Sequence, residues 1–387
     1  MNFSITKEHE HLRETLRGFF IKAAPLEEVA RFDRDEEFNT ELYRKVAEIG
    51  LCGLGFGEEY GGSGADQISI CIAVEEVARA TAALAYAWLP TATFCAKGIA
   101  KFGTEEQKRI ILPEIAVGRV RIAMGLSEPG AGSDLTHLST RATRDGSDFV
   151  IRGQKVFTTG ADTAQYIFAF VRTDPSAAPS KGLSVLLVPR DALGLTVRSL
   201  PKLAGQSTHT CEVFFDDVRV PETNLVGQPG DGSRIIFSLM DAERIYVGAE
   251  GTGLGQGALD MALAYAKERV QFGKPIIEHQ AVGHMLADMA IDVDAARLMT
   301  YRAAWKMDQG LDCSMEASMA KVFGSEAGSR CAANGMQILG GYSYMVEYGM
   351  ERYWRETKLY EIAGGTNQIM RNVIAKQLGS RCGERRP

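Results

Sequence analysis

Apolar positions along the chain change their spacing twice, near residues 120 and 229. In the first part they recur every three or four residues, as at Leu12, Leu16 and Phe19, which predicts helices. In the middle part, short runs rich in Val, Ile and Phe alternate with turn residues, which predicts strands. Long amphipathic helical patterns return in the last part. We therefore expect an N-terminal helical domain (1–120), a β domain (121–228) and a C-terminal helical bundle domain (229–387).

The expected strands have no helix of crossover length between them, which favours an antiparallel sheet over βαβ units. They span 148–160, 165–173, 182–190, 194–200 and 211–220. In the last domain, the stretch 314–339 and an apolar stripe from Met285 to Met307 predict two long helices of an antiparallel four-helix bundle. We interpret the stripe as core or subunit interface. The fold class is therefore α+β multidomain.

Composition removes several classes of function. The 387 residues carry a net charge of −6 without a long basic run, which argues against a nucleic-acid partner. No signal peptide opens the chain, and no apolar run approaches the roughly 18 residues of a membrane span. The seven cysteines are scattered and the six histidines lack ligand spacing, so we expect no metal. Free thiols fit a reducing compartment and a cytoplasmic protein.

Two stretches of the β domain are candidates for holding a planar ligand. "MGLSEPGAGSDL" (124–135) is a loop of small residues and hydroxyls, and "GQKVFTTGA" (153–161) places Phe157 beside Thr158 and Thr159 at a strand end. Glycines let the backbone approach a bulky ligand closely, and an aromatic ring with two hydroxyls can cover and bond a heterocycle. Taken singly, an ordinary turn and a plain hairpin end explain them as well.

The helical bundle contributes further candidates. Asp241, Glu243 and Arg244 begin a helix of small apolar residues. Acids at a helix start are usually dipole complements, but the turns after Glu243 lack charge until Glu250 and look buried. "AKERVQFGKPIIEHQ" (266–280) carries Arg and Lys near a glycine, which suits a pyrophosphate, although a solvated helix end explains them nearly as well.

Two glycine breaks complete the candidate set. Gly340–Gly341 interrupts a helix ahead of several aromatic residues. In "KLYEIAGGTNQIMRN" (358–372), Gly364–Gly365 separates two helices and leaves backbone N–H groups uncovered. Thr and Asn directly after that break can cap the second helix. This break looks built for a polar ligand, yet it contains no acid or base.

Together, in this order and spacing, these motifs resemble the acyl-CoA dehydrogenase family over essentially the whole chain. "MGLSEPGAGSDL" is similar to the first signature of the family, and "QILGGYSYMVEYGMERYWRE" to the second, with Ser343 where glycine is usual. The resemblance implies a homotetramer, FAD as cofactor and an acyl-CoA substrate oxidised to the trans-2-enoyl-CoA. Electrons then pass to an electron-transferring flavoprotein.

The resemblance also implies roles for individual residues. The flavin ring would contact Met124, Leu126, Ser127, Gly132, Ser133, Phe157, Thr158 and Thr159. The thioester site would be lined by Ser133, Asp241, Arg244, Gly364 and Gly365. The adenine half of an FAD shared between subunits would meet Arg269, Phe272, Gln280, Gln337, Gly340 and Gly341, and its pyrophosphate would meet Thr366 to Gln368.

The catalytic base departs from the commoner pattern. Many members carry a glutamate directly before the "GT" of the last motif, where this chain has Gly364. In the isovaleryl- and long-chain-type branch, the base comes from the helix containing "ER", and the loop reads small-Gly-Thr. We therefore assign Glu243 as the base, with Gly364 as its complement that leaves room for it and still offers a backbone N–H. Glu361 is the rival base, expected to point about a turn back.

Other functions remain open on this fold. A relative can run in reverse as an enoyl-CoA reductase, and desulfinase, monooxygenase or oxidase-like flavoenzymes also occur. A base-free member would be expected to lack Glu243. A non-catalytic acyl-CoA- or flavin-binding protein is the distant alternative. Two residues have ambiguous roles: Gln206 replaces a frequent arginine, and Trp88 either shortens the acyl pocket or is core.

Overall fold

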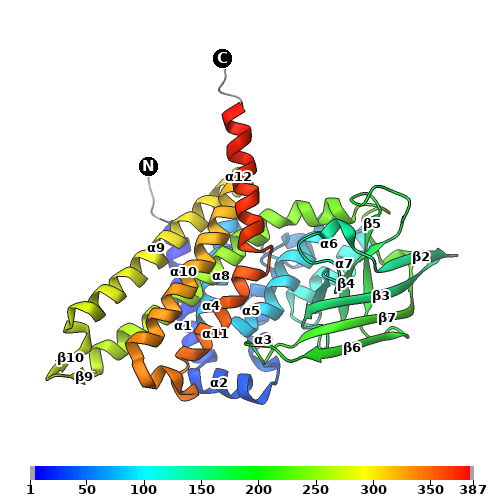
Figure 1. Cartoon of the computed structure of the whole chain (residues 1–387). Helices are drawn as coiled ribbons and strands as arrows, with labels where there is room; N and C mark the ends of the chain where they lie inside the picture. Colours follow the sequence, from blue (N-terminus) through cyan, green and yellow to red (C-terminus); the bar gives the residue numbers. More distant parts are fainter. Residues whose placement is uncertain (1–4, 384–387) are drawn as a thin grey trace.

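A computed structural model describes residues 5–383, with side chains up to residue 379. It has an N-terminal helical part, a central β part and a C-terminal helical bundle, which confirms the predicted fold class. The sheet lies at one end of the molecule, and the long helices of the bundle extend away from it (Figure 1).

The N-terminal helices pack around the core that contains Trp88. This side chain is fully buried, and its indole N–H donates to the Leu51 carbonyl at 3.1 Å, so Trp88 packs in this core. A left-handed residue, Glu36, ends α2, and the Asn39 side chain caps α3. The helices are α1 (Lys7–Ala23), α2 (Leu26–Asp35), α3 (Thr40–Glu48), α4 (Gln67–Ala80), α5 (Ala82–Leu89), α6 (Ala96–Phe102) and α7 (Glu105–Ala116), with a π-helical turn at Pro90–Cys95.

The β part is one sheet with the strand order β6-β7-β3-β2-β4-β5-β8, and β1 pairs with β4. Most neighbours are antiparallel, as predicted, but β1 runs parallel to β4, and β2 meets β4 in parallel at one residue pair. The strands are β1 (Ile122–Gly125), β2 (Arg141–Asp145), β3 (Asp148–Thr159), β4 (Tyr166–Arg172), β5 (Leu183–Pro189), β6 (Leu195–Leu200), β7 (Thr210–Pro221) and β8 (Leu225–Val226).

The C-terminal bundle is built on α8, a helix of 37 residues. Its partners include α9, whose stripe residues Met289, Val293 and Ala296 are buried as predicted for core. The helices are α8 (Gly232–Glu268), α9 (Gln280–Asp308), α10 (Ser314–Leu339), α11 (Met350–Ile362) and α12 (Asn367–Gly383), and short strands β9 (Val270–Gln271) and β10 (Lys274–Pro275) form a hairpin after α8.

Glycines bring α8 and α10 into backbone contact. A Cβ on Gly251 would lie 2.4 Å from the Gly324 carbonyl oxygen, and one on Gly324 would lie 2.5 Å from the Gly248 carbonyl oxygen. No side chain larger than hydrogen therefore fits at Gly251 or Gly324, and these glycines allow the close packing of α8 against α10.

The hairpin β9–β10 and the 3-10 turn η7 (Gly340–Tyr344) lie at the end of the bundle remote from the sheet (Figure 1). Within residues 5–383, no helix is both long enough and apolar enough to cross a membrane.

Candidate active site

Glu243 lies on α8 and is partly exposed. Its carboxyl makes no hydrogen bond or ion pair with any residue that the structure describes. Burial raises its pKa to about 7, and the neighbouring Arg244 charge opposes that rise. Arg244 itself turns back to Asp241, with 2.8 Å between Nη1 and Oδ1. The result is an unpaired carboxyl whose proton affinity suits proton exchange near neutral pH.

The glycine break predicted from the sequence follows α11. Gly364 and Gly365 have left-handed φ angles of +64° and +86°. Among residues 5–383, the N–H groups of Gly364, Gly365 and Thr366 have no acceptor, and the Thr366 hydroxyl accepts from the Ile369 N–H at 3.2 Å, so it caps α12. Free N–H groups at a helix N-terminus form a site for a carbonyl oxygen or a phosphate.

Val247 connects the break to α8. A Cβ at Gly364 would lie 3.1 Å from Val247 Cγ2, and Val247 follows Glu243 by one helical turn. Glu243 and the free N–H groups therefore lie on two elements in direct contact.

Glu361, the rival base, is engaged elsewhere. Its carboxylate accepts from the Ser329 hydroxyl and pairs with Lys358, both at 2.7 Å. Burial raises its pKa, but the Lys358 and Ser329 contacts outweigh this and lower it. A carboxylate held in this way on the α10 side is a poor proton acceptor for a ligand near α8.

The loop 124–135 is held by a buried ion pair that the sequence analysis did not single out. Lys155 of β3 donates to Glu128 at 2.7 Å, and Glu128 also accepts the N–H groups of Ser139 and Thr140. Burial raises the pKa of Glu128, but the Lys155 charge and these hydrogen bonds lower it to about 2. The available signal was Lys155 within an alternating strand, at a position that faces inward.

The three residues 157–159 at the end of β3 differ in how far their side chains are exposed. Phe157 is 67% exposed and has φ +58°, whereas Thr158 is fully buried. Thr159 is partly exposed. The Thr158 hydroxyl is buried without a partner among the described residues, whereas the exposed Phe157 ring is accessible to a ligand.

The loop beside this strand end is open where a ligand can approach. Added Cβ atoms at Gly130 and Gly132 would meet nothing within 4 Å. Ser133 is exposed, while Met124, Leu126 and Ser127 are partly buried. The Ser127 carbonyl accepts the Val156 N–H at 2.9 Å, so loop and strand form one surface that fits a planar ring.

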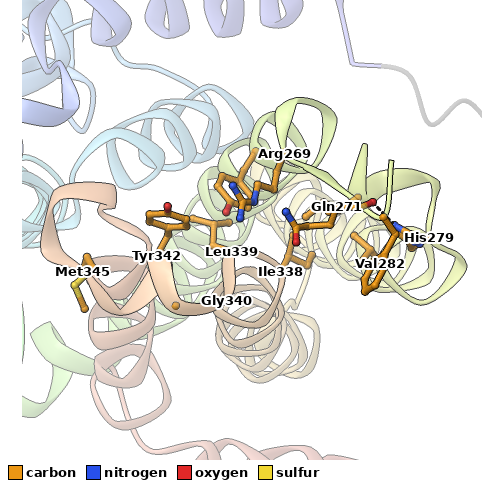
Figure 2. Close-up of a pocket in the computed structure, with 13 residues that line it drawn as sticks. Arg269, Gln271, His279, Val282, Ile338, Leu339, Gly340, Tyr342 and Met345 are labelled. Carbon is orange, nitrogen blue, oxygen red and sulfur yellow. Dashed lines mark hydrogen bonds between the residues drawn. The ribbon is translucent and has the colours of Figure 1, made fainter. Parts of the chain in front are cut away.

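A second concave site lies at the remote end of the bundle. A groove of about 640 Å³ (Figure 2) is lined by residues of two segments, Arg269, Gln271 and Phe272 directly after α8 and Gly340, Gly341 and Tyr342 of η7. The Arg269 guanidinium lies 5.7 Å from the centroid of the Tyr342 ring. Gln280 and Gln337 are exposed next to lining residues but do not line the groove.

The groove and the Glu243 site are far apart within one chain. Arg269 follows Glu243 by 26 residues, of which nearly all belong to α8, so about 39 Å of helix separates them. A single dinucleotide is too short to place its planar ring near Glu243 and its adenine in the groove of the same chain. The described residues also hold no cluster of three or more His, Cys, Asp or Glu side chains suited to a metal.

Comparison with known proteins gives consistent matches along the chain. Family models described as acyl-CoA dehydrogenase N-terminal, middle and C-terminal domains match residues 6–119, 123–218 and 230–379. The chain is 42% identical to a probable acyl-CoA dehydrogenase, YngJ, of Bacillus subtilis, covering 98% of this chain and 100% of the relative. It is 37% identical to an acryloyl-CoA reductase (NADH) of Anaerotignum propionicum, covering 98% and 97%. A solved FAD complex of PigA superposes with a TM-score of 0.92 at 28% identity, covering 98% and 100%.

Proposed function

The chain belongs to the acyl-CoA dehydrogenase family, and from this premise we propose that it removes hydrogen from Cα and Cβ of an acyl-CoA thioester and yields the trans-2-enoyl-CoA. It is an oxidoreductase, and its cofactor is FAD. The observation that carries the proposal is the unpaired Glu243 carboxyl, placed on a helix that touches a loop of free N–H groups.

The Glu243 carboxyl and the free N–H groups have different roles in the proposed reaction. The thioester α-proton is weakly acidic, so N–H donors at the carbonyl oxygen have to stabilise the charge that develops there. The free N–H groups of Gly364 and Gly365 supply such donors. Glu243 takes the proton from Cα and becomes a neutral acid. FAD, when bound, supplies the acceptor for the hydride that leaves Cβ.

The cofactor fits residues of two chains. The open loop 124–133 with exposed Phe157 suits the ring, and the N-terminus of α12 at Thr366 to Gln368 suits the pyrophosphate. The groove with Arg269, Phe272, Gly340 and Gly341 suits the adenine half that comes from a second chain, beside Gln280 and Gln337. We assign Ser133, Asp241 and Arg244 to the thioester side. This division requires an oligomer, and a homotetramer meets the requirement.

Other aspects extend the same proposal. The electrons pass to an electron-transferring flavoprotein in the cytoplasm. Reduction of an enoyl-CoA is the second candidate, favoured by the 37% identity to an acryloyl-CoA reductase. The two directions share Glu243, which would return the proton to Cα in reduction.

Anaerobic bleaching of the bound flavin tests the function. We expect purified protein to be yellow and to lose colour with saturated acyl-CoA thioesters from a panel of straight, branched, cyclic and aromatic acyl groups. A protein that takes up no FAD, or a FAD-loaded protein that no acyl-CoA bleaches, contradicts dehydrogenation. Oxidation of the reduced protein by an enoyl-CoA, without bleaching by any saturated partner, supports the reductase instead.

A further inference from the structure

A second acid, which is buried, lies on the same face of α8 as the proposed base. Glu250 follows Glu243 by seven residues, or about two helical turns, and Val247 lies between them on that face. Glu250 is 4% exposed. The proposed dehydrogenation gives Glu250 no role, although burying an acid that has no ion pair lowers the stability of the folded protein.

The surroundings of Glu250 are polar and incompletely hydrogen-bonded. Its Oε1 accepts only a long hydrogen bond, 3.3 Å from the Tyr360 hydroxyl. The Tyr86 ring packs 6.1 Å from the Tyr360 ring, and the Tyr86 hydroxyl is buried beside the Tyr360 hydroxyl, to which it makes no hydrogen bond of normal geometry. Buried polar groups are normally satisfied, so these groups are suited to a ligand that supplies the missing partners.

Glu250 keeps its proton to a higher pH than an ordinary glutamate does. Burial, and then the charge of Glu243, raise its pKa to about 8. The neutral acid can donate as well as accept, and the two tyrosines likewise present hydroxyl groups. This set therefore suits an uncharged oxygen function.

The spacing along α8 matches a short acyl chain. Seven residues advance about 10.5 Å along the helix. A hydrogen bond at each end takes up about 3 Å, which leaves about 4–5 Å. An extended chain covers about 3.3–3.6 Å in three bonds. Three or four bonds beyond an α-carbon held at Glu243 therefore bring an atom to Glu250.

We propose that Glu250, Tyr86 and Tyr360 form a hydrogen-bonding floor that selects acyl-CoA thioesters bearing a hydroxyl or carbonyl oxygen on C4 or C5. This inference rests on the proposed dehydrogenation. Its physical basis is asymmetric: a methyl group at this depth leaves the buried polar groups unpaired, whereas an oxygen at the same place satisfies them.

Isosteric substrates test the floor directly. 4-Hydroxybutyryl-CoA is compared with pentanoyl-CoA, and 5-hydroxypentanoyl-CoA with hexanoyl-CoA, by kcat/KM for flavin bleaching. For the hydroxylated substrate with the higher kcat/KM, we expect this value to exceed the kcat/KM of its alkyl isostere by about 10-fold or more. Glu250→Gln keeps a donor and an acceptor and should retain most of this ratio. Glu250→Leu should lower the ratio by about 10-fold or more.

The tyrosines provide an independent variant and a matched control. Tyr86→Phe removes only the Tyr86 hydroxyl and should lower the ratio several-fold. Tyr43→Phe removes another buried hydroxyl, which lies in the core beside Cys52 and Thr91, and should leave the ratio unchanged. Should Glu250→Leu fail to fold, Tyr86→Phe combined with Tyr360→Phe decides the question.

The outcomes separate the two proposals. If the alkyl thioesters bleach the flavin as fast as their hydroxylated isosteres, the floor is refuted and the dehydrogenase stands. A ratio that Glu250→Leu and the double tyrosine variant both leave unchanged refutes it too. If none of these four thioesters bleaches a FAD-loaded protein but another acyl-CoA of the panel does, the floor alone fails. If no acyl-CoA of either set bleaches it, the proposed function fails and the floor fails with it.

Discussion

Val247 Cγ2 lies 3.1 Å from the position that a Cβ on Gly364 would occupy. This contact brings the loop after α11 against α8, one turn beyond Glu243. The absence of a side chain at Gly364 is therefore a steric requirement of this contact, and it leaves room for the base that we propose at Glu243.

Gly364→Ala should destabilise the protein and slow flavin bleaching. The left-handed backbone costs roughly 1–2 kcal/mol for a residue with a Cβ, and the contact with Val247 adds to this cost. Adding Val247→Ala should relieve the steric part alone. Thermal unfolding of the single and double variants measures both parts, and an unchanged melting temperature for Gly364→Ala would exclude the described loop conformation.

Glu243→Gln should lower the rate of flavin bleaching by about 10²- to 10⁴-fold, the usual share of a general base. FAD content and perturbation of the flavin spectrum by acyl-CoA should persist, because the amide has nearly the same shape. Glu361→Gln is the matched control: its carboxylate is held by Ser329 and Lys358, so bleaching should stay within a few-fold of the parent. The reverse ranking of the two variants would transfer the base to Glu361.

Flavin bleaching should speed up as pH rises through about 7. Glu243 accepts a proton only when ionised, and burial raises its pKa to about 7, so the protonated, inactive form dominates below that pH. Stopped-flow bleaching between pH 5.5 and 8.5 measures this limb. A rate independent of pH across this range, with proton transfer shown to be rate-limiting by a deuterium isotope effect, would contradict the assignment.

Glu250→Gln should gain stability over the parent as pH rises. The pKa of Glu250 is about 8 in the folded protein, against an ordinary value of 4.5. The folded state thus retains a proton that the unfolded chain releases, and the associated stability, full below pH 4.5, is lost as pH rises through 8. The variant lacks this loss. The difference in melting temperature should therefore grow from pH 5 to pH 9, and a constant difference would show that Glu250 does not titrate.

Lys155→Met should cost about 3–5 kcal/mol of stability, because it leaves the Glu128 carboxylate buried without its charge partner. FAD content should fall as well, since Glu128 holds the loop 124–135 against β3. Adding Glu128→Gln should restore part of the stability. Chemical denaturation and the flavin absorbance per chain report the two effects, and a Lys155→Met protein with full stability would show that the pair contributes little.

The sequence predicted the architecture well because spacing alone carries it. The stretch 314–339 coincides with α10, and the segment 148–160 with β3, since helix and strand periods differ clearly. The parallel pairing of β1 with β4 could not be predicted, because neither strand shows its partner in its own pattern.

The site was predicted less completely than the fold. Motif order drew attention to Glu243, Gly364 and Arg269, but the sequence could not tell which way a side chain points or what it meets. Asn367, expected as a cap, is instead buried and accepts from Lys321 at 2.8 Å. Glu250 was noticed only as the next charge after Glu243, because its partner Tyr360 lies 110 residues away.

The backbone contact between α8 and α10 has a consequence for changes made far from the substrate. α8 carries the proposed base Glu243 and, two turns further along, Glu250, and its last residues lead into the remote groove. A methyl group at Gly324 would push α8 away from the Gly248 carbonyl and displace these positions together. Catalysis, acyl preference and cofactor retention should then fail jointly in such a variant, although none of its atoms meets a ligand.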